Sequence, residues 1–301
     1  MPFRRHFFIF LIAVSVMPLP AQWGATDGYL DFQSAAQLRT FMSWTPERAP
    51  LISAHRGGPA PGYPENCLET LAHTLSRVPS LMEIDVRMTR DSVLVLMHDE
   101  RIDRTTTGSG AVDSLALADL RALRLRDNGG AVTDYRIPTL REALAWADGR
   151  TILKLDVKRT IDPARVVALI EEMDAAAHVI VITYGVESAE RYYGLNPDLM
   201  LSISLGDMAA LDRLRAGRIN PAAVLAFVGV SEPEPDLYAR LHDAGISTIL
   251  ATIGNLDRMA ARRGGQVYRR LVDEGADMLS TDYPDRVYDA IRDRMALPLR
   301  D

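Results

Sequence analysis

Short apolar runs alternate with amphipathic stretches along most of the chain. Nine runs of five to seven residues have the character of strands: 51–55, 81–86, 93–98, 152–157, 179–183, 199–205, 224–230, 246–252 and 277–281. Seven stretches with helical character lie between most of them: 68–77, 115–123, 140–146, 163–175, 208–214, 236–244 and 256–274. Repeated alternation of strands and helices predicts an α/β fold with a parallel sheet.

The length of 301 residues and the lack of a GxGxxG fingerprint favour a closed (β/α)8 barrel of the TIM type. Nine candidate strands compete for eight places, and the sequence does not identify the surplus one. Only a short turn separates Val86 from Val93, although parallel strands need a longer crossover. A long polar stretch covers 100–138. We therefore expect an irregular barrel with an insertion, about 100–138, after the strand that ends at His98.

The first 50 residues are expected to precede the barrel domain, which we assign to 51–301. Arg4 and Arg5 stand before an apolar stretch that prolines follow, a pattern typical of a secretory signal peptide, assigned to 1–21. An uncleaved membrane anchor is the alternative, but the stretch is short for a span. We expect a periplasmic or secreted protein with no stable membrane span after cleavage. Residues 22–50 form an N-terminal extension with one predicted helix, about 32–44.

The composition, 48% hydrophobic and 25% charged, is ordinary for a soluble globular protein. Loss of Arg4 and Arg5 with the signal changes the net charge from −6 to −8, which argues against nonspecific nucleic-acid binding. Cys67 is the single cysteine, so no internal disulfide can form. The oligomeric state does not follow from these numbers.

Acidic residues share strand faces in two of the apolar runs. The period of two places Glu83 with Asp85, and Lys154 with Asp156 and Lys158. In a barrel that face points inward, because the other face contacts the helices, and charges there need partners. A cation bound among the three carboxylates would supply one, and oxygen ligands favour Ca²⁺ or Mg²⁺. A salt-bridge network without metal is the alternative.

Two histidines end apolar runs and can divide the acid and base roles. His55 and His98 are the candidates for proton transfer. Arg56 offers a planar guanidinium suited to phosphate oxygens. Glu65 and Asp282 are candidates for lining the site, although Asp282 could instead hold a helix N-terminus.

Asn66, followed three residues later by Glu69, fits a capping box. We therefore expect the Asn66 side chain to cap the helix predicted over 68–77.

In combination, the motifs resemble the glycerophosphodiester phosphodiesterase family. The matching segments, in chain order, are Ala54-His55-Arg56-Gly57-Gly58, Pro64-Glu65-Asn66, Glu83-Ile84-Asp85-Val86, 98–108, Ile137-Pro138-Thr139-Leu140, Asp156-Val157-Lys158 and Ser280-Thr281-Asp282-Tyr283-Pro284. They span about residues 50–290. The order His, Glu-x-Asp, His also resembles phosphoinositide-cleaving phospholipases, which leaves the substrate less defined.

The resemblance implies metal-dependent hydrolysis of a small-molecule glycerophosphodiester to an alcohol and glycerol phosphate. It implies that His55 and His98 are the general acid and base, and that Arg56 and Lys158 contact the phosphate. The metal ligands it implies are Glu83, Asp85 and Asp156. The alternatives are a phospholipase-type lyase or a lysophospholipase D acting on lipid head groups, and a non-catalytic phosphodiester-binding protein.

The chain departs from the family pattern at two places. Asp156 stands where the family usually has glutamate, so the carboxylate is one methylene shorter. The family often has a tryptophan near the seventh strand, where this chain has Leu250-Ala251-Thr252. The first departure bears on metal affinity and the second on the leaving group that the pocket accepts.

Overall fold

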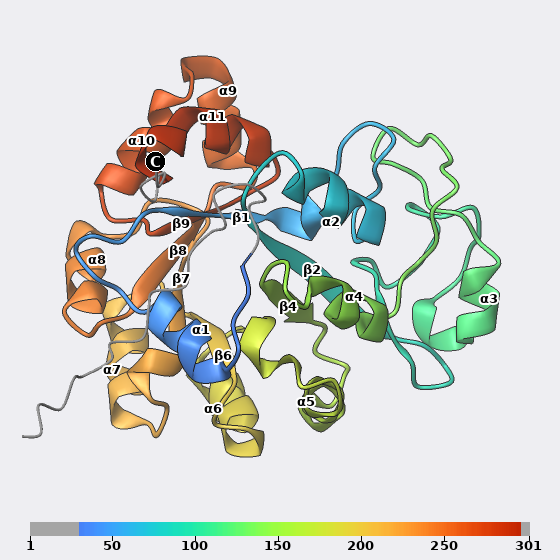
Figure 1. Ribbon diagram of the computed structural model, residues 1–301, viewed down its shortest axis with the longest axis horizontal. Helices are drawn as coiled ribbons and strands as arrows, with labels where there is room; N and C mark the ends of the chain where they lie inside the picture. The colour runs from blue at the N-terminus through green and yellow to red at the C-terminus, as the bar shows by residue number, and fades with distance from the viewer. Residues whose placement is uncertain (1–29, 296–301) are drawn as a thin grey trace, which may run out of the picture.

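Eight parallel strands close into a barrel in the computed structural model, which describes residues 30–295 (Figure 1). With one further strand they form a sheet ordered β1-β9-β8-β7-β6-β5-β4-β2-β3, in which β1 also pairs with β2. The strands are β1 Leu51–Ala54, β2 Leu81–Met88, β3 Leu94–Leu96, β4 Leu153–Val157, β5 Val179–Thr183, β6 Met200–Ser204, β7 Val224–Gly229, β8 Ser247–Ala251 and β9 Met278–Thr281. The predicted (β/α)8 barrel is confirmed.

The surplus strand among the nine predicted is β3. It pairs antiparallel with β2, with Val86 opposite Leu96 and Met88 opposite Leu94. An antiparallel pair can be joined by a tight turn, so the short connection before β3 needs no crossover helix. The hairpin therefore extends β2 beyond the barrel, and the eight remaining strands close the ring.

Helices follow most strands, as predicted. They are α1 Ala35–Met42, α2 Leu68–Leu75, α3 Leu117–Arg121, α4 Leu140–Ala147, α5 Pro163–Glu172, α6 Val186–Leu195, α7 Met208–Ala216, α8 Pro235–His242, α9 Asn255–Arg263, α10 Gln266–Asp273 and α11 Pro284–Met295. Helices α6 and α11 are not among the stretches predicted from the sequence. The prediction of one helix over 256–274 is wrong, because Gly264 at φ 94° separates α9 from α10.

The barrel interior is apolar at the end where the strands begin. Each of the eight strands contributes one apolar side chain from within or just before it: Leu51, Leu81, Ile152, Ile180, Met200, Leu225, Ile249 and Met278. Helix α1 packs against this layer through Leu38 and Met42, which are fully buried. Further along the strands the inward positions become polar, and this places the charged residues at the opposite, carboxyl end of the barrel.

The segment between β3 and α4 lies beside the barrel, beyond α2, and carries the short helix α3 (Figure 1). Its buried apolar residues Met97, Ile102, Val112, Leu120, Leu125 and Ile137 form a small separate core with Val95 of β3 and with Cys67, which precedes α2. The Asp127 carboxylate accepts a hydrogen bond of 2.8 Å from the Gly62 amide, which ties this segment to the loop after β1.

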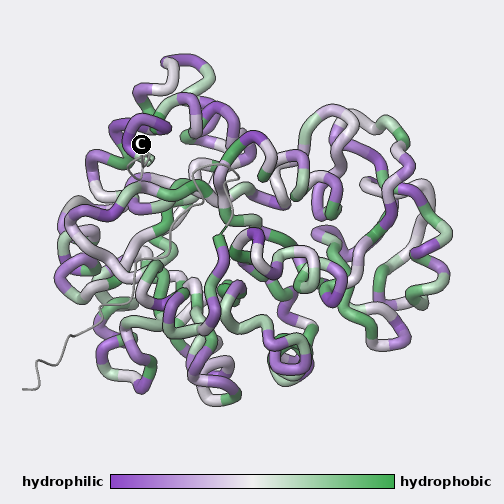
Figure 2. The backbone as a smooth tube through the Cα atoms, viewed as in Figure 1, coloured by the Kyte–Doolittle hydropathy of each residue, from purple (hydrophilic) through white to green (hydrophobic). Residues whose placement is uncertain are grey.

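Hydrophobic stretches of the chain coincide with the central strands, whereas the surrounding turns are mostly hydrophilic (Figure 2).

Among residues 30–295, no helix has both the length and the apolar character needed to cross a membrane. The predicted signal peptide, 1–21, lies outside the described residues.

The turn after β1 depends on a glycine. Gly57 has φ 83°, and a Cβ atom on it would clash with Leu71 Cδ2 of α2. We expect Gly57→Ala to lower the free energy of unfolding by about 2–4 kcal/mol, from backbone strain and a core clash together. Urea denaturation measures this loss.

Gly62→Ala provides the control, because Gly62 has φ 78° and a Cβ atom on it would meet no other atom within 4 Å. It should lose only the strain contribution, about 1–2 kcal/mol. Equal losses in the two variants would contradict a close contact between Gly57 and α2.

Candidate active site

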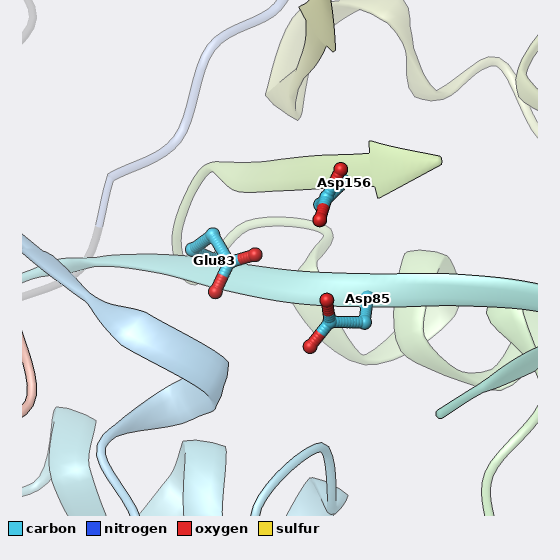
Figure 3. Close-up of side chains that lie close together, drawn as sticks. All are labelled: Glu83, Asp85 and Asp156. Carbon is cyan, nitrogen blue, oxygen red and sulfur yellow. The ribbon is translucent and has the colours of Figure 1, made fainter. Parts of the chain in front are cut away.

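Three carboxylates meet where β2 and β4 run side by side. Glu83 and Asp85 project from β2, and Asp85 stands opposite Asp156 in the strand register. One oxygen from each lies within 4.8 Å of the others (Figure 3). Glu83 and Asp85 are buried and Asp156 is half-buried. The period of two along each strand, read from the sequence, is what brings these acids to one place.

The cluster carries more negative charge than its buried surroundings readily hold. Burial and the neighbouring Asp85 carboxylate raise the pKa of Glu83 to about 7. The Arg56 amide donates a 2.7 Å hydrogen bond to Glu83 Oε2, which only partly offsets this. Burial lowers the pKa of the Lys154 ammonium to about 8. The site is therefore one that an additional cation would stabilise.

Lys158 lies between two of the three predicted metal ligands. Its Nζ donates to Asp85 Oδ1 at 2.5 Å and to Asp156 Oδ2 at 2.6 Å. The Tyr184 hydroxyl donates to the other Asp156 oxygen at 2.5 Å. Burial raises the pKa of Asp156, but the bonds from Lys158 and Tyr184 outweigh it, so the net shift is downward. The predicted contact of Lys158 with a phosphate stays a prediction.

His55 is held by an aspartate from the last strand. Its Nδ1 lies 2.7 Å from Asp282 Oδ1, and its Nε2 lies 4.0 Å from Glu83 Oε2. An ionised carboxylate can only accept, so Nδ1 carries the proton and Nε2 faces the carboxylate cluster. Burial lowers the pKa of His55, but the bond to Asp282 and the charges of Glu83 and Asp282 outweigh it and raise the pKa overall. Buried Asp257 accepts the Asp282 amide at 3.2 Å and fixes this turn.

A chain of charged contacts links the second histidine to Arg56. His98 Nδ1 lies 2.7 Å from Asp99 Oδ1. Arg104 donates to Asp99 at 2.6 Å and to the buried Glu65 at 2.7 Å. Glu65 also accepts from Arg56 Nη1 at 3.1 Å. Because the Arg56 amide contacts the carboxylate cluster, both histidines belong to one connected network at the carboxyl end of the barrel.

This network and the carboxylate cluster contain every residue that the sequence pointed to: His55, Arg56, Glu65, Glu83, Asp85, His98, Asp156, Lys158 and Asp282. Sequence reasoning gave no role to Asp99, Arg104 or Tyr184. Asp99 adjoins a predicted residue, which was the available signal. Arg101 and Arg104 both lie in a run of alternating charges. The sequence there does not show which of the two arginines forms a buried ion pair and which is exposed to solvent.

The prediction that Asn66 caps a helix is wrong. Helix α2 begins at Leu68 with Cys67 at the N-cap position, and no side chain caps it. Asn66 has φ 56°, its Nδ2 donates to Asp85 Oδ2 at 2.8 Å, and its Oδ1 accepts the Asp85 amide at 2.9 Å. A hydrogen bond stabilises a buried carboxylate more than it stabilises a helix end that water can reach. The Asn66 side chain therefore bonds Asp85 instead of capping α2.

Comparison with known proteins places the chain among the barrel-fold phosphoric diester hydrolases. The model of the glycerophosphoryl diester phosphodiesterase family matches residues 55–286, and the chain belongs to this family. The match begins at His55 and extends past Asp282, so it includes the whole network described above.

Solved structures and a curated relative agree with this membership. The crystal structure of a glycerophosphoryl diester phosphodiesterase from Parabacteroides distasonis is 34% identical, with a TM-score of 0.85 over 90% of this chain and 95% of that one. A glycerophosphodiester phosphodiesterase from Bacillus altitudinis is 25% identical over 259 residues, 81% of this chain and 98% of the relative. An Oleispira antarctica phosphodiesterase, solved with the product sn-glycerol-3-phosphate, shares the fold at 22% identity and a TM-score of 0.64, covering 81% of this chain and 97% of that one.

The bond between Asp282 and His55 gives a prediction about titration. Asp282→Asn removes the negative charge beside Nδ1, so the pKa of His55 should fall below its wild-type value. NMR titration of the His55 ring protons measures the change. Asp289→Asn, an exposed site on α11, is the control and should leave the His55 titration unchanged. An unaltered His55 pKa in Asp282→Asn would contradict the pairing.

Proposed function

We propose that the protein hydrolyses glycerophosphodiesters to an alcohol and glycerol phosphate by metal-assisted acid–base catalysis. The observation that carries this proposal is the convergence of three carboxylates with two histidine–aspartate pairs at one end of the barrel. Family membership supports the diester as substrate. The Oleispira antarctica relative, which binds sn-glycerol-3-phosphate, supports glycerol phosphate as the product that this site would hold.

Glu83, Asp85 and Asp156 would hold one divalent cation, Ca²⁺ or Mg²⁺. The fit is supported by their spacing, within 4.8 Å, and by the oxygen-only donor set, which suits hard cations. It is also supported by the pKa of Glu83, which burial and repulsion from Asp85 raise and which a cation would lower again. When bound, the cation would offset negative charge that develops on the phosphoryl oxygens.

The two histidines would transfer the protons. Each is held through Nδ1 by an aspartate, Asp282 for His55 and Asp99 for His98, so Nε2 is the atom available to the substrate. One imidazole takes a proton from the attacking oxygen while the other protonates the leaving alkoxide. Arg56 would contact the phosphate through Nη2, since Nη1 bonds Glu65 and Nε lies 3.7 Å from Asp85 Oδ2. Lys158 would also contact the phosphate once a cation holds Asp85 and Asp156.

We further propose that the reaction takes place in the periplasm or outside the cell. The support is the pattern of residues 1–21, in which two arginines precede an apolar stretch and prolines. An exported enzyme would meet diesters released from lipids or supplied by the surroundings.

Replacement of either histidine tests the catalytic assignment. His55→Ala and His98→Ala should each lower turnover of a glycerophosphodiester by about 10²–10⁴, with folding retained by circular dichroism. Phosphorus NMR of the products measures turnover and identifies a phosphate monoester. His73→Ala is the control, since His73 stacks on Tyr63 and, within residues 30–295, has no ion pair with a residue of the cluster. Near-wild-type turnover in both site variants, or a cyclic phosphate as the final product, would refute the proposal.

Proton competition at Glu83 gives a prediction for metal binding. Below pH 7 Glu83 is mostly protonated in the metal-free protein, and it must lose that proton to act as a ligand. The Kd for Mg²⁺ or Ca²⁺ should therefore rise by up to about tenfold per pH unit as the pH falls below about 7, and level off above it. Calorimetric titration between pH 5.5 and 8 measures it.

The variant Glu83→Gln provides the comparison, because glutamine does not titrate. It should bind the cation more weakly at pH 8 and show a flatter dependence on pH. A wild-type Kd that is constant across this range would rule out Glu83 as a titrating ligand.

A further inference from the structure

A cavity of about 690 Å³ opens beside the carboxylate cluster. The carboxyl ends of β4, β5 and β6 and the first turns of α5, α6 and α7 line it. Lys158 and Tyr184 belong to its wall and also bond the Asp156 carboxylate, so these two side chains lie between the cavity and the candidate metal centre. Ile161 and Ile182 are among its apolar lining residues.

Three arginines at the rim of this cavity lack carboxylate partners. Arg159, Arg191 and Arg213 line it and are exposed, and within residues 30–295 none makes an ion pair or a hydrogen bond through its side chain. The Arg159 guanidinium lies over the Tyr184 ring, 5.0 Å from its centroid. That stacking leaves the in-plane N–H groups free to donate. Exposed arginines elsewhere in the chain are often paired, as Arg269 is with Asp293.

Two acids also line the cavity, and they do not cancel this charge. Asp207 is used by the fold, because its side chain accepts the Ala210 amide at 2.7 Å and caps α7. Glu187 lies in the first turn of α6. Lys158 is already paired with Asp85 and Asp156, so the wall offers three arginines against two carboxylates, one of which is engaged as a cap.

We propose that this cavity binds a second negatively charged group on the leaving alcohol of the substrate. The preferred substrates would then be glycerophosphodiesters whose alcohol itself carries a phosphate group. This inference rests on the proposed function of the adjoining carboxylate cluster. Guanidinium groups bind phosphate oxygens through paired N–H donors, and a cationic head group such as choline would face like charge in the same position.

The test compares three diesters: glycerophosphocholine, glycerophosphoglycerol, and glycerophosphoglycerol with a phosphate monoester on its outer glycerol. We expect the wild type to show a kcat/KM for the phosphorylated diester about tenfold above that for glycerophosphocholine at low salt. The preference should shrink between 0.05 and 0.5 M NaCl because screening weakens it. Equal values for the three diesters would overturn the proposal.

The double variant Arg191→Gln/Arg213→Gln tests whether the preference for the phosphorylated diester arises from the arginines of this cavity. It should lower kcat/KM for the phosphorylated diester about tenfold while changing the value for glycerophosphocholine far less. The matched control is Arg165→Gln on α5, an exposed arginine outside the cavity wall, and its substrate preference should equal that of the wild type. A preference that survives in the double variant, or is lost in the control, would overturn the assignment to this cavity.

If the wild type cleaves none of the three diesters, the proposed function is wrong. Calorimetric Kd values for the same compounds then test the proposed binding site in the cavity independently of catalysis. Tighter binding of the phosphorylated diester that the double variant loses would support the subsite. Equal Kd values would overturn it.

Discussion

The structure depends on how the barrel accommodates several carboxylates at its carboxyl end. Glu83 and Asp85 are buried there on one strand, and Asp156 faces them from the next. Buried negative charges require cations or hydrogen-bond donors close by, because water cannot solvate them. The surrounding residues meet part of that need with the Lys158 ammonium group, the Asn66 side-chain amide and the Arg56 backbone amide. The resulting arrangement places donors and acids at fixed positions before any substrate arrives.

The same requirement joins segments that are distant in the sequence. Glu65 follows β1, and Arg104 belongs to the segment beside the barrel, yet they form a close ion pair of 2.7 Å. Arg104 also holds Asp99, and Asp99 holds the His98 ring. The loop that carries His98, which we propose transfers a proton, is thereby fixed to the loop that carries Arg56, which we propose contacts the phosphate. Such fixed geometry is what acid–base chemistry needs, since proton transfer is sensitive to small displacements.

Much of the fold and the site could be predicted from the sequence, for identifiable reasons. The alternation of apolar runs and helices indicates the barrel, and a period of two places Glu83 with Asp85 on an inward face. The identity of the surplus strand was out of reach, because β3 has the same apolar pattern as a barrel strand and differs only in direction. Asn66 was misjudged because its neighbours fit a capping box, whereas its actual partner lies 19 residues away. Partners of that kind depend on the packed structure, which local patterns do not describe.

Tyr184 connects the departure from the family pattern at Asp156 with the cavity beside it. Asp156 is one methylene shorter than the usual glutamate, and its two oxygens are bonded by Tyr184 and Lys158. The same tyrosine ring lies beneath the Arg159 guanidinium at the cavity rim. A substrate group bound by the rim arginines would therefore rest next to a side chain that positions a predicted metal ligand. Binding of a leaving group in this cavity, as proposed, would thus be linked to the geometry of the carboxylate cluster through Tyr184 and Lys158, and that link would give the chain a physical means to select among diesters.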